Sequence, residues 1–140
     1  VFFSGKKIIS NSLLNEINYG KAEGMKFNLF KKKFKKIIKS WESGKDEKFP
    51  GGESTYDVMK RVNKFLFLLK KIEGKKKILI ISHSFFLRVL IGIILKFDLK
   101  KIYKLKLDHL KLFEIIKSNN NFLPNFERGE IYKFYRQLND

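Results

Sequence analysis

The longest apolar stretch of the chain is interrupted once, by a short polar loop. Residues 78–81 are an unbroken run of β-prone residues, and residues 85–95 are apolar at nearly every position except Arg88 and Gly92. Three lysines precede the stretch, and Ser82-His83-Ser84 divides it. The pattern predicts a buried parallel strand over 78–81, a polar loop, and a buried helix over 85–95.

Elsewhere the spacing of apolar residues predicts two amphipathic helices. Residues 25–41 place apolar side chains at helical spacing with lysines between them, and residues 54–72 form one apolar stripe. Ser54, with Asp57 three positions later, resembles a capping box at the start of the second helix. Later in the chain, residues 103–117 are expected to contain a strand, 118–129 a loop and 130–138 a returning last strand. Ile8 and Ile9 are candidates for a brief strand.

The composition indicates one globular domain over residues 1–140. Hydrophobic residues make up 44% of the 140 positions and aromatic residues 15%, which argues against disorder. The absence of cysteine excludes disulfides and thiolate chemistry. No cleavable signal pattern opens the chain, so the default expectation is a cytoplasmic protein.

The charge points less clearly to a partner. The formal net charge is +17, which suits a nucleic-acid partner, but only four of the 31 basic residues are arginine. A surface built to bind polyanions favours arginine for its bidentate phosphate geometry, so we expect no nucleic-acid function. The apolar stretch is about as long as a membrane span, and the helix over 25–41 is basic and amphipathic. His83 and Arg88 would be costly within hydrocarbon, so we expect no membrane partner.

His83 is the first candidate for chemistry. A loop that leaves a parallel strand at its carboxyl end and opens a helix presents free N–H groups to an anion. A histidine in an apolar setting is, however, often only a core residue. Glu16 and Glu23 lie in a loop rich in Asn and Gly, where either could be a solvated or capping carboxylate. His109 is assigned no role.

Three segments in this order, LLNEINYGKAEG, FPGGESTYDVMKRV and ILIISHSFFLRVL, together resemble the histidine phosphatase superfamily, the phosphoglycerate mutase-like fold. The resemblance implies a three-layer α/β/α domain with a mostly parallel central sheet and the active site at the carboxyl ends of its strands. The interval between Glu16 and Pro50 is short. That favours a phosphatase of the α-ribazole or broad-specificity kind over a phosphoglycerate mutase.

The resemblance also implies roles for individual residues. Glu16 would donate a proton to the leaving oxygen and then act as the base for water, while His83 would bind the phosphoryl oxygens. The N–H groups of Ser84 and of Phe85 would add to this cradle. Glu53 and Ser54 would be structural, and Arg61 an ion-pair partner or a helix-surface residue. The substrate would be a small phosphorylated metabolite, and the enzyme would need neither metal nor cofactor.

The chain also departs from the family pattern. It contains no Arg-His-Gly motif, which carries the nucleophilic histidine, and it lacks the second phosphate-binding arginine. Ser84 stands directly after His83, where family members often have glycine, and the bulky Phe85 follows it. We therefore expect a domain that lacks its first strand, is inactive alone and exposes a hydrophobic sheet edge at 78–81.

Four alternatives stay open at this point. The first is a mutase-type phosphotransferase, and the second is a non-catalytic descendant of the fold that binds phosphorylated ligands or polyanions. In the third, a separate polypeptide supplies the missing strand, and in the fourth the chain forms a homodimer.

Overall fold

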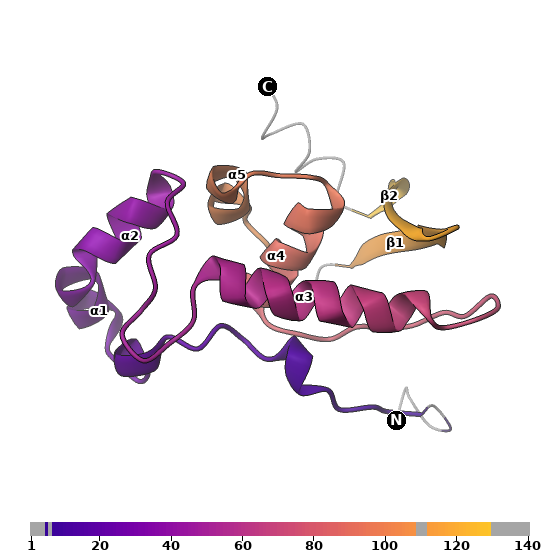
Figure 1. Cartoon of the computed structure of the whole chain (residues 1–140), viewed down its shortest axis with the longest axis horizontal. Helices are drawn as coiled ribbons and strands as arrows, with labels where there is room; N and C mark the ends of the chain where they lie inside the picture. Colours follow the sequence, from indigo (N-terminus) through magenta and orange to yellow (C-terminus); the bar gives the residue numbers. More distant parts are fainter. Residues whose placement is uncertain (1–4, 6, 109–111, 130–140) are drawn as a thin grey trace.

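The computed structural model describes residues 5, 7–108 and 112–129 (Figure 1). Two short 3-10 turns, η1 (Ser12–Leu14) and η2 (Gly20–Ala22), come first. The helices α1 (Phe27–Lys33), α2 (Lys35–Glu42), α3 (Thr55–Lys70), α4 (Ser84–Ile94) and α5 (Leu99–Lys104) follow. A hairpin of β1 (Phe113–Ser118) and β2 (Asn121–Gly129) completes the described part.

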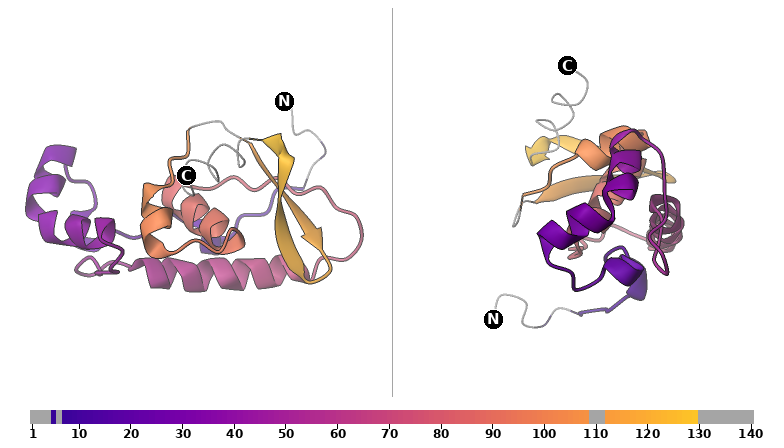
Figure 2. Two further views of the ribbon diagram at one scale, coloured as in Figure 1. Left: turned by 90° about the horizontal axis from the view of Figure 1, so that it is seen from above. Right: turned by 90° about the vertical axis from the view of Figure 1, so that its left-hand side faces the viewer.

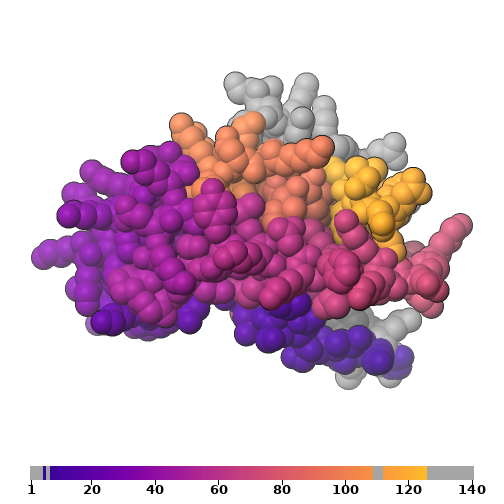
Figure 3. Space-filling view, in the orientation of Figure 1, coloured from indigo at the N-terminus to yellow at the C-terminus, as the bar shows by residue number. Residues whose placement is uncertain are grey.

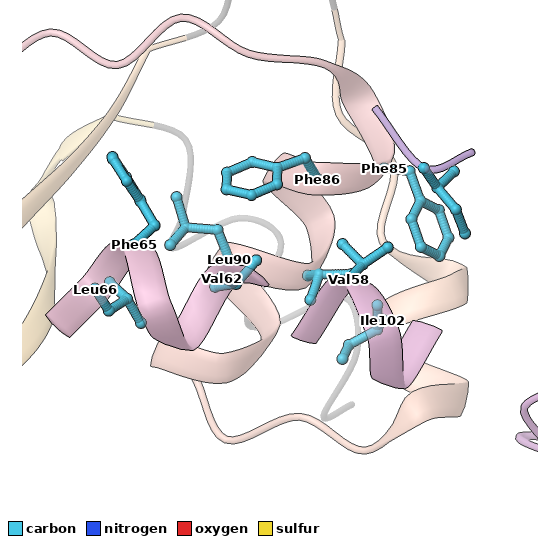
Figure 4. Packing of buried hydrophobic residues seen from close by; sticks show 10 residues of the cluster. Val58, Val62, Phe65, Leu66, Phe85, Phe86, Leu90 and Ile102 are labelled. Atoms are coloured by element: carbon cyan, nitrogen blue, oxygen red, sulfur yellow. The ribbon is translucent and has the colours of Figure 1, made fainter. Parts of the chain in front are cut away.

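The core lies between α3 and α4. The predicted capping box is confirmed, since Ser54 Oγ accepts from the N–H of Asp57 and the Asp57 carboxylate accepts from the N–H of Ser54. The apolar stripe of α3 packs against α4, as Figure 4 shows, and the buried members of this cluster are Ile17, Val58, Val62, Phe65, Leu66, Phe85, Phe86, Val89, Leu90 and Ile102. Gly92 lets α5 approach α4 closely, because a Cβ there would collide with the side chain of Ile102.

The predicted single helix over 25–41 is two helices. Phe34, with φ −107° and ψ 23°, separates α1 from α2. Its buried ring packs against Phe30 and Phe49, with centroids 5.9 and 5.4 Å away. The break directs this ring into a second, aromatic cluster. Burying the ring there stabilises the fold more than an uninterrupted helix would. Figures 1 and 2 place α1 and α2 at the end of the molecule away from the hairpin.

The C-terminal hairpin confirms one expectation and corrects another. The strand expected within 103–117 is β1, while residues 99–104 are helical. The loop expected over 118–129 is wrong, because β2 pairs antiparallel with β1 over most of that range. Asn119 takes a left-handed conformation, φ 51°, which closes the turn and lets the Asn-rich segment pair. The expected strand over 130–138 and His109 lie outside the described residues.

The parallel central sheet is the main expectation that the described residues do not meet. Residues 76–83 belong to no helix or strand in the described part of the chain, and Ile78, Leu79 and Ile81 are 51, 54 and 75% exposed. Ile8 and Ile9 are likewise exposed and belong to no strand in the described part of the chain. A strand needs a neighbour for its hydrogen bonds, and within the described ranges 78–81 has none. What is supported is an α/β fold with packed helices and a small antiparallel two-stranded sheet.

The space-filling view shows α3 across one face, with α1 and α2 at one end (Figure 3). Among the described helices, none is both long enough and apolar enough to cross a membrane.

Candidate active site

Glu16 lies at the N-terminus of α4. Its Oε1 accepts hydrogen bonds from the N–H groups of Phe85 and Phe86, each at 3.1 Å, and Oε2 accepts from Phe85 at 3.1 Å. The N–H of Ile17 donates to the same Oε1 at 3.1 Å. A helix N-terminus leaves N–H groups unpaired and carries partial positive charge, and this carboxylate meets both. Glu16 therefore caps a helix that begins far along the chain.

His83 and Ser84 stand at the same end of α4. His83 is the N-cap residue, with φ −99° and ψ 162°, and Ser84 is the first helical residue. The carbonyl of His83 accepts the N–H of Leu87 at 3.0 Å, but its side chain makes no capping hydrogen bond and is exposed. The fold thus brings Glu16, His83 and Ser84 to one helix end, with the imidazole facing outward. Their roles in catalysis stay predictions.

One part of the predicted phosphate cradle is already occupied. The N–H of Phe85, expected to face phosphoryl oxygens, donates to Glu16 instead. The helix end therefore holds an anion of the chain itself, in the place where sequence reasoning expected an anion from outside.

Glu53 and Arg61 form a bidentate ion pair beside this loop. Arg61 Nε lies 2.8 Å from Glu53 Oε1, and Nη2 lies 3.0 Å from Oε2. Burial favours the neutral acid, but hydrogen bonds from Arg61 and from the N–H of Asn18 hold the pKa of Glu53 below its ordinary value. Of the two roles expected for Arg61, the ion-pair partner is the one found.

Three aromatic rings, Trp41, Phe85 and Tyr103, form a wall beside the N-terminus of α4. Trp41 stacks on Phe85 at a centroid distance of 5.3 Å and on Tyr103 at 5.1 Å with an interplanar angle of 5°. The Trp41 indole N–H donates to the carbonyl of Glu47 at 2.7 Å, and burial raises the pKa of Tyr103. Sequence reasoning missed this wall, since Trp41 and Tyr103 meet only through the packing of α2 on α5.

Tyr19 and Arg88 complete the surroundings of Glu16. Burial, followed by the charge of Glu16, raises the pKa of Tyr19 to about 12, although Arg88 acts in the opposite direction. Arg88 Nε is buried and has no hydrogen-bond partner among the described residues. Within the residues that the structure describes, no group of three or more His, Cys, Asp or Glu side chains is arranged to hold a metal ion.

The chain is similar to known proteins in sequence and in fold. The family model of the histidine phosphatase superfamily (branch 1) matches residues 3–123. The crystal structure of the α-ribazole phosphatase from Shigella flexneri has a similar fold, with a TM-score of 0.71 and 19% sequence identity. The matched region covers 86% of this chain but only 60% of that chain. No match was found among curated proteins.

Proposed function

The chain belongs to the histidine phosphatase superfamily, and from that premise we propose that the intact protein hydrolyses phosphomonoesters. The observation that carries this proposal is the carboxylate of Glu16 fixed at the N-terminus of α4, beside His83. A carboxyl group next to a helix N-terminus combines a proton carrier with donors for developing negative charge. The substrate is a small phosphorylated metabolite, and a phosphorylated α-ribazole is the first to test, because a similar structure is an α-ribazole phosphatase.

The reaction has two steps. A histidine nitrogen forms a bond to phosphorus while the bond to the leaving alkoxide breaks, and the Glu16 carboxyl gives its proton to the leaving oxygen. Water then forms a bond to phosphorus as the histidine–phosphorus bond breaks, and the Glu16 carboxylate takes the proton of that water. His83 holds the phosphoryl oxygens in both steps.

The attacking histidine comes from outside the 140 residues. Neither His83 nor His109 stands in the Arg-His-Gly motif that the family uses. Segment 78–81, with Ile78, Leu79 and Ile81 exposed, offers an edge where a strand carrying that motif can pair. The match covering only 60% of the α-ribazole phosphatase agrees with this proposal. By itself the 140-residue chain is inactive.

The first experiment uses the native protein purified from its source. Intact mass and N-terminal sequencing establish whether an Arg-His-Gly segment accompanies the chain, on the same polypeptide or a second one. Turnover is then measured with an alkyl phosphate and with p-nitrophenyl phosphate. A substrate labelled in phosphorus identifies the phosphorylated histidine.

Variants of this protein test the roles. Glu16→Gln should lower kcat for the alkyl phosphate by about 10²- to 10⁴-fold and affect p-nitrophenyl phosphate far less, because nitrophenolate leaves without a proton. His83→Ala should impair both substrates, and Glu42→Gln, an exposed carboxylate of α2, should impair neither. Unchanged alkyl phosphate turnover in Glu16→Gln, or label on His83, would contradict the assignment.

A second candidate function is binding of polyanions or phosphorylated ligands without catalysis. The observation that favours it is the net charge of +17. Such binding should weaken steeply with salt and be indifferent to Glu16→Gln, whereas hydrolysis depends on Glu16. Transfer of the phosphoryl group to a second metabolite, rather than to water, would identify a mutase-type enzyme.

A further inference from the structure

The main chain around Glu16 is held by side chains from two distant segments. Arg61 Nη1 donates to the carbonyls of Leu13 at 2.7 Å and Asn15 at 3.0 Å, and Nη2 reaches the carbonyl of Glu16 at 3.4 Å. Ser82 Oγ donates to the carbonyl of Leu14 at 2.6 Å. Four successive carbonyls, from 13 to 16, thus accept hydrogen bonds from only two side chains.

The residues that follow Glu16 are held by Glu53. Its Oε2 accepts the N–H of Asn18 at 2.9 Å, and its own N–H donates to the carbonyl of Asn18 at 2.7 Å. The same carboxylate receives the guanidinium of Arg61, and the side chains of the pair are only 22 and 19% exposed. The loop is therefore fixed on both sides of Glu16 by one partly buried ion pair.

We propose that Arg61 is the positioning residue of the site, acting with Glu53 and Ser82 to hold the Glu16 carboxylate against α4. This inference rests on the proposed role of Glu16 as acid and base. All three guanidinium nitrogens of Arg61 donate to groups of the chain itself, which makes a positioning role the one that its contacts support. The fork of an arginine spans several acceptors at once, which a lysine ammonium cannot do in the same plane.

Ser82 links the segment of Glu16 to that of His83. It directly precedes His83, and its hydroxyl is bonded to the segment that carries Glu16. The two predicted site residues are therefore tied together through their main chains. A shift of the Glu16 loop has to move the segment of His83 as well.

The test follows the amide resonances of Phe85 and Phe86 in the isotopically labelled 140-residue chain during an acid titration. Because both N–H groups donate to Glu16, their chemical shifts should follow the protonation of its carboxylate. Glu16→Gln should abolish this titration and gives the reference. The same titration in His83→Ala removes any contribution of the neighbouring imidazole.

Arg61→Lys is expected to reduce the titration shift of both amides by at least half while the core resonances of Val62 and Val89 stay in place. Lys60→Ala, on the exposed side of the same helix, should leave the shift unchanged. If folded Arg61→Lys shows the same titration shift of both amides as the parent chain, the proposal is overturned. If that variant does not fold, Ser82→Ala decides, since it removes one hydroxyl and should also reduce the shift. A full shift there overturns the proposal equally.

An activity arm separates this inference from the function on which it rests. In the intact enzyme, Arg61→Lys should repeat the leaving-group dependence of Glu16→Gln, with the alkyl phosphate affected more than p-nitrophenyl phosphate. If the amide titration behaves as expected but Glu16→Gln turns over the alkyl phosphate normally, positioning holds and the acid role fails. If Glu16→Gln is impaired but Arg61→Lys and Ser82→Ala both keep the full amide titration shift, the function holds and the positioning role fails.

Discussion

At the scale of single residues, Glu16 serves structure and proposed chemistry with the same two oxygens. The sequence identified it through its segment and through resemblance, and left open whether it was a capping carboxylate. It is one, but the helix that it caps is α4, whose N–H groups lie 69 and 70 positions further on. A capping pattern is visible in sequence only when its partners are a few positions apart. No local signal could have predicted this contact.

The first prediction concerns that cap. Glu16→Ala should lower the free energy of unfolding of the 140-residue chain by about 1–2 kcal/mol, because two buried helix N–H groups lose their acceptor. Glu16→Gln should cost less, since the amide oxygen still accepts one of these bonds. Urea unfolding of the three proteins at pH 7 measures the difference. Equal stability of Glu16→Ala and the parent chain would show that the cap contributes nothing.

At the scale of elements, the sequence predicted those helices and strands that depend on neighbouring residues. It did not predict those that depend on contacts with distant residues. The start of α3 followed from Ser54 and Asp57, and the strand β1 from its β-prone residues. The break at Phe34 was missed because its cause is a ring cluster with Phe49, outside the helix. β2 was missed because Asn-rich composition favours a loop until a partner strand supplies the pairing. In both cases tertiary contacts overrode the local preference.

The capping box of α3 should make stability depend on acid. The N–H of Ser54 and then the ammonium of Lys48 hydrogen-bond the Asp57 carboxylate and lower its pKa to about 2, from about 3.9 in an unfolded chain. Because the folded pKa is the lower one, this stabilisation is complete above about pH 4 and is lost as the pH falls towards 2.

Asp57→Asn should therefore lower the free energy of unfolding by about 1 kcal/mol at pH 7. The gap between the variant and the parent chain should narrow between about pH 4 and 2. Thermal unfolding of both proteins across this range measures the gap. A gap of constant size from pH 7 to pH 2 would mean that the Asp57 charge does not stabilise the helix start.

At the scale of the whole molecule, family membership was predictable but the sheet was not. The three motifs agree with the family match over residues 3–123, yet 78–81 forms no strand within the described residues. An apolar β-prone run predicts a buried strand only if neighbours exist to bury it, and a single sequence does not say whether they do. Glu16, His83 and Ser84 do lie together at the N-terminus of α4, while their catalytic roles stay predictions.

The exposed segment 78–81 should make the 140-residue chain associate with itself. Among the described residues, 78–81 has no partner strand, and an apolar segment without one is a template for pairing with another chain. Ile81, the most exposed side chain of the segment at 75%, is the place to test this. Ile81→Lys should suppress association while changing the free energy of unfolding by less than about 0.5 kcal/mol, as for other exposed positions. Light scattering against protein concentration measures the effect.

Leu68→Lys supplies the matched control. Leu68 is 46% exposed on α3, where the helix already satisfies the backbone hydrogen bonds. If association arises from segment 78–81, Leu68→Lys should leave the association unchanged. This variant raises the net charge by the same amount as Ile81→Lys. Equal suppression by both variants would attribute the effect to charge repulsion. Segment 78–81 would then have no special part in the association of the chain.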